Sequence, residues 1–417
     1  MIFYFFKYWL TLGMRMWYKR VYVHYHAPLP TDAPIIFAST HPNSAIDYLF
    51  SPLIHHQPTY VLVRGDVFEK KMLNAMFRAI FMLPVYRFRD GYTSLNKNEQ
   101  SFKECYNTFD KNGKVLIFSE GVCVQEKVLQ PLRKGTARLA LDYLNKHGGE
   151  KVYVITQAAS STQFRQFRAT AMVNFGEPID ARDYNELYAE NPNKAYEALT
   201  KEITKRLEQD FIIEKEYSDD SWTEKALMAL RLNFNTISSE WSPADRSRFD
   251  LENNLVQKLN DLGENALSDE WKAQSLILRP ENEGLLNKNN SQFKFLFKII
   301  LLAPFVGLAW LMVLIPNSIT NWLIKNKIKD KIFTTTVTVI GGVLLYLIQA
   351  IILLIIGLAS FGIYGFAFPM IMIILTMIGM EVVDEFRMAY YNWKNIKQKD
   401  DYQFLLDEVT SLSNSPN

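Results

Sequence analysis

The sequence contains little cysteine, little histidine and almost no net charge. Its 417 residues include two cysteines and six histidines, which excludes a disulfide scaffold and leaves little material for a multi-metal site. A formal net charge of +2 removes the overall electrostatic attraction on which a nucleic-acid-binding protein depends. The length exceeds that of one typical domain, so we expect a sizeable core and a second module.

A local absence of charge marks the C-terminal part of the chain. Between Ile332 and Met380 there are 49 residues without Asp, Glu, Lys or Arg. One membrane crossing needs about 20 residues, so this run suits two crossings. We therefore expect transmembrane helices at about 334–356 and 361–380. A buried core helix is the alternative, which the length and the lack of charge disfavour. The mean hydropathy of −0.08 hides this run.

A second uncharged run precedes it, from Ile299 to Ile324, and contains Pro304 and Pro316. If this run also crossed the membrane, the lysine-rich segments on either side of the hairpin would be exported, against the positive-inside rule. We therefore expect a re-entrant or interfacial element at 299–316, within a membrane module of residues 291–400. Residues 401–417 would then form a cytoplasmic tail.

The N-terminal residues 1–20 mix aromatic side chains with Lys7, Arg15, Lys19 and Arg20. Aromatic rings and basic tips suit the headgroup region, so we expect an interfacial membrane-anchor helix. A cleaved signal peptide is disfavoured because Lys7 interrupts the apolar stretch and no small-residue cleavage site follows. A first helix packed on the domain is the other alternative.

Residues 21–214 alternate short apolar runs with amphipathic segments, which predicts an α/β domain with a mostly parallel sheet flanked by helices. Residues 215–290 look helical and polar, and we interpret them as a connector. The expected strands cover 21–26, 34–40, 59–64, 81–86, 114–119, 151–156 and 168–176, and the expected helices cover 44–55, 67–80, 94–110, 133–146 and 193–210.

Chemistry in such domains collects on loops at the carboxyl ends of strands. In STHPNSAIDY, His41 follows the strand at 34–40 and Asp47 lies early in the next helix. A histidine can take a proton from a hydroxyl, and a carboxylate on its other nitrogen fixes the tautomer. In PVYRFRDG, Arg87 and Arg89 offer guanidinium groups that suit a phosphate.

A third loop, IFSEGVC, ends the strand at 114–119 with Glu120 and Gly121. The glycine would let backbone N–H groups approach a ligand, and Glu120 could bind a hydroxyl or orient an arginine. Downstream, Lys134 precedes a helix start, a position that favours anion binding.

The order of these motifs, with FRATAMVNFGEPI at 167–179, resembles the glycerolipid acyltransferase family of lysophosphatidate and glycerol-3-phosphate acyltransferases, in its HPN-containing branch. The resemblance covers roughly residues 20–210. It implies that His41 is the catalytic base and Asp47 its partner. It also implies that Arg87 binds phosphate and that Glu120 and Gly121 serve the acceptor site.

The resemblance implies transfer of an acyl group from acyl-CoA or acyl-carrier protein to a glycerol hydroxyl, without a bound cofactor or metal, at a membrane. We expect membrane lipids and a glycerol-phosphate acceptor as partners, and no nucleic acid. We expect the protein in the cell membrane, a bacterial inner membrane, with the catalytic domain facing the cytoplasm.

Three departures from the family pattern stand out. Five residues separate His41 from Asp47, where four are commonest. Ser119 replaces the usual proline before Glu-Gly, and the segment VITQAA lacks a proline that the family carries. These departures leave an alternative function open, that of a membrane-anchored interaction protein with a decayed active site. A thioesterase that activates water with the same base is also open, whereas Cys123 is disfavoured as a nucleophile because no histidine adjoins it in sequence.

Among acceptors, 1-acylglycerol-3-phosphate is the first expectation. Glycerol-3-phosphate and another lyso-lipid are the alternatives.

Overall fold

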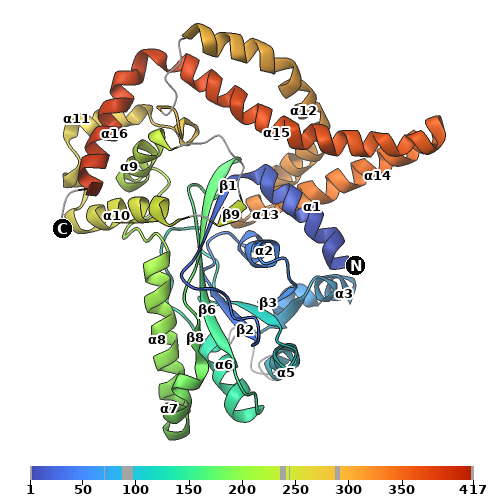
Figure 1. Ribbon diagram of the computed structural model, residues 1–417, viewed down its shortest axis with the longest axis vertical. Helices are drawn as coiled ribbons and strands as arrows, with labels where there is room; N and C mark the ends of the chain where they lie inside the picture. Colours follow the sequence, from blue (N-terminus) through green and yellow to red (C-terminus); the bar gives the residue numbers. More distant parts are fainter. Residues whose placement is uncertain are drawn as a thin grey trace.

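The computed structural model describes residues 2–69, 71–86, 97–234, 241–243, 245–286 and 292–414. A nine-stranded sheet forms its centre, in the order β4-β3-β5-β2-β6-β7-β1-β9, with β8 beside β6 (Figure 1). The strands are β1 (Tyr18–Tyr25), β2 (Ile35–Ser39), β3 (Thr59–Arg64), β4 (Met82–Val85), β5 (Lys114–Phe118), β6 (Tyr153–Ser161), β7 (Ala169–Phe175), β8 (Ile179–Asp180) and β9 (Trp241–Pro243).

The sheet is mostly parallel, which confirms the predicted α/β class. Strand β2 pairs in parallel with β5 and β6, and β3 pairs in parallel with β4 and β5. Only the pairings of β6 with β7 and β8 are antiparallel among those described. The parallel strands therefore present their carboxyl ends at one edge, where His41 and Glu120 follow β2 and β5.

Both faces of the sheet are buried, because side chains alternate between two cores along each strand. In β2, Ile36 and Ala38 join one core, and Ile35 and Phe37 join the other. Helices α5, α6 and α8 cover the first face, and α1 and α2 cover the second. The α-helices of this part are α2 (Ala45–Ile54), α3 (Lys71–Ala79), α5 (Lys97–Phe109), α6 (Gly135–Lys146), α7 (Asn185–Glu190) and α8 (Pro192–Asp210).

The segment at 215–286 and the C-terminal helix form one helical unit with its own apolar core, in contrast to the separate connector and cytoplasmic tail expected from the sequence. Its α-helices are α9 (Trp222–Leu230), α10 (Ser247–Leu262), α11 (Asp269–Gln274) and α16 (Lys399–Asn414). Trp271 is fully buried and donates its indole N–H to the carbonyl of Leu405 at 3.0 Å. Residues 401–414 are thus a docked amphipathic helix.

The N-terminal helix α1 (Ile2–Trp17) packs on α14 (Gly342–Phe361) and α15 (Ala367–Lys394) as well as on β1 and α2. Residues 18–20 already belong to β1, so the helix is shorter than the expected 1–20. A Cβ at Gly13 would lie 2.2 Å from Val343 in α14, so this glycine permits the close approach of the two helices. Tyr4 and Tyr8 are exposed, whereas Met14 is buried in the sheet core.

Two helical segments, Phe293–Lys327 and Lys331–Lys394, are long and apolar enough to cross a membrane by length and composition. The first is α12 (Gln292–Lys327), which runs through Pro304 and Pro316 as one helix. The element expected at 299–316 is therefore part of a longer helix that continues beyond both of these bounds.

The second segment comprises the short α13 (Thr334–Thr336), a π-helical turn at Val337–Gly341, α14 (Gly342–Phe361) and α15 (Ala367–Lys394). The hairpin turn lies at Gly362–Phe366, a few residues later than expected. Helix α15 is also longer than the expected span at 361–380. Figure 1 shows this hairpin projecting away from the sheet.

Candidate active site

His41 and Asp47 meet at the carboxyl edge of the sheet. His41 follows β2, Asp47 lies in the first turn of α2, and Nδ1 of His41 is 3.3 Å from Oδ2 of Asp47. The same Oδ2 accepts the backbone N–H of Asn43 at 2.6 Å. Because Asp47 occupies Nδ1, the Nε2 atom of His41 is the one that can act on a substrate proton.

The longer spacing between His41 and Asp47 is absorbed by the intervening loop. Ser44 has a φ of 52°, in the left-handed region that a non-glycine residue rarely adopts. The chain turns sharply there, directly before α2 begins at Ala45. Backbone strain of this kind collects at functional sites, where the surrounding contacts hold it in place.

The His41 imidazole keeps 17% side-chain exposure, whereas Asp47 keeps 2%. The ring stacks on Phe118 with a centroid distance of 3.6 Å. Burial raises the pKa of Asp47, while the hydrogen bonds from His41 and from the Asn43 N–H act in the opposite direction. A buried carboxylate that is hydrogen-bonded to a histidine can stabilise the imidazolium that forms when the histidine takes a proton.

Glu120 joins the loops that follow β2 and β5. Its Oε1 accepts the backbone N–H of His41 at 2.8 Å, and its Oε2 accepts the N–H of Gln130 at 3.0 Å. Burial raises the pKa of Glu120 to about 7, although the two N–H donors lower it. Both oxygens are used in bracing the backbone, and acceptor binding by Glu120 stays a prediction.

The turn after β5 fits the residues that occupy it. Gly121 has a φ of 67°, and a Cβ there would lie 3.3 Å from Cγ of Arg133. Ser119, in place of the family proline, makes a 2.9 Å hydroxyl contact with Thr136 in α6. The Ser119 carbonyl also accepts the N–H of Arg133 at 2.7 Å. The serine thus ties the turn to α6 without displacing Glu120.

The remaining predicted site residues are Arg87, Arg89 and Lys134. Arg87 and Arg89 lie outside the described residues, and β4 ends just before them. The side chain of Lys134 is half exposed and forms a 3.1 Å ion pair with Glu197 of α8. Nothing in the described contacts of Lys134 joins it to His41, so its anion-binding role stays a prediction. Within the described ranges, no group of three or more His, Cys, Asp or Glu side chains could hold a metal ion.

Cys123 lies beside the His41 loop, where its Sγ accepts the N–H of Ser44 at 3.3 Å. Burial raises the pKa of Cys123 to about 12, and the carboxylates of Asp47 and Glu120 add to the effect. The group is therefore a neutral thiol near pH 7 and a poor nucleophile.

Sequence reasoning missed two buried amides in the site. Gln157, in the segment that lacks the family proline, donates to Oγ of Ser39 at 3.2 Å and to the carbonyl of Asp47 at 3.4 Å. Asn43 is 1% exposed and accepts a hydrogen bond from Gln125 at 3.3 Å. Two features of the sequence could have indicated these amides. Gln157 is a polar residue within an apolar strand, and Asn43 lies two positions after His41.

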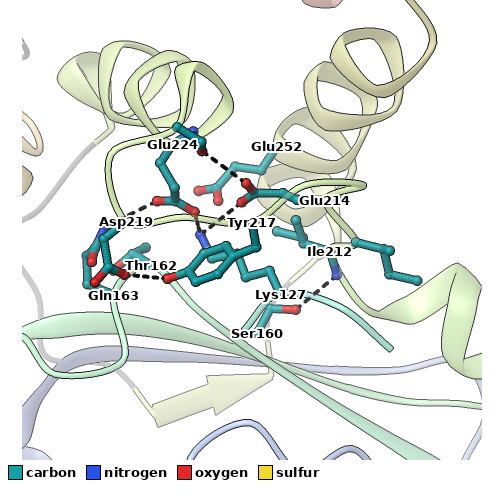
Figure 2. A network of polar contacts seen from close by, with 12 residues as sticks. Lys127, Ser160, Thr162, Gln163, Ile212, Glu214, Tyr217, Asp219, Glu224 and Glu252 are labelled. Atoms are coloured by element: carbon teal, nitrogen blue, oxygen red, sulfur yellow. Dashed lines mark hydrogen bonds and ion pairs between the residues drawn. The ribbon is translucent and has the colours of Figure 1, made fainter. Parts of the chain in front are cut away.

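The loop after Glu120 is also fastened to the helical unit (Figure 2). Lys127 is 1% exposed and forms ion pairs with Glu224 and, at 3.8 Å, with Glu214. The carbonyl of Lys127 accepts the N–H of Glu214 at 2.8 Å, and Gln163 donates to Glu224 at 3.1 Å. The buried Lys127 holds the loop in one place, because without it Glu224 would keep only the longer, 4.0 Å ion pair with Arg231.

The family described as Acyltransferase matches residues 20–160. Residues 20–160 therefore belong to the acyltransferase family. The match confirms the resemblance to the glycerolipid acyltransferases, and it contains His41, Asp47, Glu120 and Gly121.

A curated relative of this acyltransferase domain is glycerol-3-phosphate O-acyltransferase 2 of Saccharomyces cerevisiae. It is 30% identical over 118 residues, which is 28% of this chain and 16% of the yeast protein. The chain thus matches about a sixth of that relative's length. A solved structure, the 1-acyl-sn-glycerophosphate acyltransferase PlsC of Thermotoga maritima, covers 51% of this chain and 80% of its own, at 15% identity and a TM-score of 0.33.

Proposed function

We propose that the chain is a membrane-bound glycerolipid acyltransferase that moves a fatty acyl group from a thioester donor to the free hydroxyl of 1-acylglycerol-3-phosphate. The observation that carries the proposal is the His41–Asp47 pair, braced by Glu120, inside a domain of the acyltransferase family. The donor in this proposal is acyl-CoA or acyl-carrier protein, and it arrives as a substrate.

In the proposed reaction, Nε2 of His41 removes the proton of the acceptor hydroxyl while that oxygen attacks the thioester carbonyl carbon. A C–O bond forms, and the C–S bond breaks as the tetrahedral intermediate collapses. The departing thiolate takes the proton from the imidazolium, so His41 returns to its neutral form. Asp47 stabilises the imidazolium between these steps. General-base catalysis of this kind contributes about 10²–10⁴-fold.

Arg87, with Arg89, holds the acceptor phosphate in this proposal. A guanidinium group can make two parallel hydrogen bonds to a phosphate. The support is that these arginines follow β4 in the sequence, and that β4, β3, β5 and β2 are parallel, so β4 ends at the same edge of the sheet as β2.

Glycerol-3-phosphate is the second candidate acceptor. The observation that favours it is the 30% identity to the yeast glycerol-3-phosphate O-acyltransferase. The two candidates differ in whether the acceptor already carries an acyl chain.

The test is product identification with the purified full chain in phospholipid vesicles. Labelled acyl-CoA or acyl-carrier protein is incubated with 1-acylglycerol-3-phosphate, glycerol-3-phosphate or monoacylglycerol. We expect label in phosphatidic acid from the first acceptor. Label in 1-acylglycerol-3-phosphate from the second would select the alternative, and label in free fatty acid without any acceptor would indicate a thioesterase.

The matched control is His41→Ala, which removes the base while leaving a folded protein. We expect acyl transfer to fall to background in this variant. Near-normal transfer by His41→Ala would overturn the mechanism, and no transfer by the unaltered chain to any acceptor would overturn the function.

We also propose that the module binds the membrane with the catalytic domain on the cytoplasmic side of a bacterial inner membrane. Thr335 at the start of the hairpin contacts Phe164, and Asp384 in α15 pairs with Arg168, so both legs of the hairpin begin beside the domain. The uncharged turn at Gly362–Phe366 is then the part that enters or crosses the bilayer.

Helix α12 is proposed to lie in the interface. Near its start Lys298 pairs with Glu385, and near its end Thr320 approaches Gly341. Glu385 and Gly341 each lie close in sequence to a residue that contacts the domain, so both ends of α12 lie near the domain. This supports a helix that lies along the membrane surface. The lysines that follow α12 would remain on the cytoplasmic side, as the positive-inside rule favours.

A further inference from the structure

Thr335 is a buried polar residue at the start of the membrane hairpin. It lies in α13 and is 0% exposed. Its hydroxyl donates to the backbone carbonyl of Phe164 at 2.9 Å. Phe164 belongs to the acyltransferase part of the chain, in the turn between β6 and β7, so this bond joins the two modules.

The same carbonyl also accepts a hydrogen bond from the active-site loop. The side-chain amide of Asn43 donates to the Phe164 carbonyl and to the hydroxyl of Tyr18, each at 3.3 Å. A carbonyl oxygen has two lone pairs, so Thr335 and Asn43 together fill it. Tyr18 is the first residue of β1 and directly follows α1. The side chain of Asn43 is therefore held by Tyr18, which follows α1, and by the Phe164 carbonyl, which the start of the hairpin also contacts.

Asn43 connects this arrangement to catalysis through its backbone, because its N–H donates to Oδ2 of Asp47 at 2.6 Å. Two further observations put the hairpin beside the site. Val339, in the π-helical turn after α13, belongs to the same apolar core as Ile46 of α2. Asp330, just before α13, also acts electrostatically on Cys123 of the site. Burial is the main cause of the raised pKa of Cys123, and the Asp330 carboxylate adds to it.

We propose that Thr335 is a positioning residue through which the membrane hairpin sets the geometry of the His41–Asp47 pair. The inference rests on the proposed acyl transfer. Without the Thr335 hydroxyl, the Phe164 carbonyl loses the shorter of its two hydrogen bonds. The carbonyl is then less firmly held, and so is the Asn43 amide that donates to it. The loop that carries Asn43 then relaxes, and its N–H no longer holds Asp47 in line with His41.

The experiment compares Thr335→Val with Thr335→Ser and Thr338→Val, in the full chain reconstituted in vesicles. Thr338 donates to the carbonyl of Thr334, so its variant loses a hydroxyl of the same module whose hydrogen bond stays within that module. For Thr335→Val we expect kcat to fall about 3- to 10-fold, the size of one lost hydrogen bond, with the acceptor KM within about twofold. Thr335→Ser should restore kcat, and Thr338→Val should behave as the unaltered chain.

Equal kcat values for Thr335→Val and Thr338→Val would overturn the inference. An unaltered chain without acyl transfer would overturn the proposed function instead, so the two failures are distinguishable. Thr335→Ala, which cannot overpack the site, supplies the same comparison if the valine variant does not fold.

A double-mutant cycle with Asn43→Ala gives a second readout. Because Thr335 is argued to act through Asn43, its substitution should lower kcat less than about twofold once Asn43 is alanine. Thr338→Val should remain neutral in both backgrounds. Strict additivity of Thr335→Val and Asn43→Ala would show that the hydroxyl has a purely structural role, and would overturn the inference.

Discussion

The backbone N–H of His41 donates a 2.8 Å hydrogen bond to Oε1 of Glu120, a residue 79 positions later in the chain. The bond joins the loop after β2 to the loop after β5, which are neighbouring parallel strands. The acidic residue of the Glu-Gly motif thus holds the backbone of His41, the proposed catalytic base.

Glu120→Gln is expected to lower kcat about 10-fold or more, because one carboxylate oxygen becomes an amide NH₂ that faces a backbone N–H donor. The measurement is kcat with saturating acceptor and donor. Glu197→Gln, on the exposed partner of Lys134, is the matched control and should leave kcat unchanged. A Glu120→Gln enzyme as active as this control would contradict the bracing role.

Glu120 also predicts a pH dependence of stability. Its folded pKa of about 7 lies above the ordinary value of 4.5, so the folded protein binds this proton more tightly than the unfolded chain. The resulting stabilisation is fully present below pH 4.5 and is lost as the pH rises towards 7. The difference in unfolding midpoint between the unaltered chain and Glu120→Gln should therefore shrink between about pH 5 and about pH 7.5. A difference that stays constant over this range would contradict the raised pKa.

Asp47→Asn is expected to lower kcat by about 10²-fold or more while leaving the fold intact. The side-chain amide carries no negative charge and cannot stabilise an imidazolium. Its NH₂ group is also a donor, and it cannot accept the Asn43 N–H as the Asp47 carboxylate does. Steady-state kinetics measure the loss, and circular dichroism checks the fold. Asp261→Asn, on a carboxylate that is 78% exposed, should retain full activity. Comparable kcat values for the two variants would count against the His41–Asp47 pair.

Lys127→Met is expected to destabilise the protein by about 3 kcal/mol, because Glu224 loses its nearer cation and keeps only Arg231, at 4.0 Å. Lys134→Met removes a lysine from an exposed pair and should cost no more than about 1 kcal/mol. Thermal unfolding of the two variants measures the contrast. Similar midpoints would show that the ion pairs of Lys127 contribute no more than a surface pair.

Cys123→Ser should retain acyl transfer within about twofold, because a thiol with a pKa of about 12 is not the nucleophile. Reaction of Cys123 with a maleimide should be slow near pH 7 for the same reason. Loss of transfer in Cys123→Ser, combined with acyl label bound to the unaltered protein, would support a covalent intermediate instead.

The α/β class and the sites of His41, Asp47 and Glu120 could be predicted because their signals are local. Short apolar runs predicted strands such as β3, found at its expected bounds of 59–64. The parallel order then brings the loop residues to one edge of the sheet. The contact between His41 and Asp47 could be expected from a spacing that places His41 just after a strand and Asp47 in the first turn of the helix that follows.

Features that depend on distant partners could not be predicted in this way. The α16 sequence reads as a polar tail, and only its packing against Trp271 makes it part of a core. Pro304 and Pro316 indicated breaks in α12, but a proline can remain within a helix when neighbouring helices support it, and α15 packs along this one. The burial of Lys127 likewise depends on Glu214 and Glu224, about 90 positions away.

The ion pair between Arg168 and Asp384 has a consequence for the order in which the protein matures. The two residues are 216 positions apart, and Arg168 also donates to the carbonyls of Arg15 and Met16 at the end of α1. At about 5–20 residues per second, roughly 10 to 40 seconds of synthesis separate the two partners. The contacts of Arg168 at the junction of α1 and the sheet are therefore complete only after α15 has been synthesised, and a nascent chain that still lacks Asp384 leaves Arg168 without this carboxylate partner.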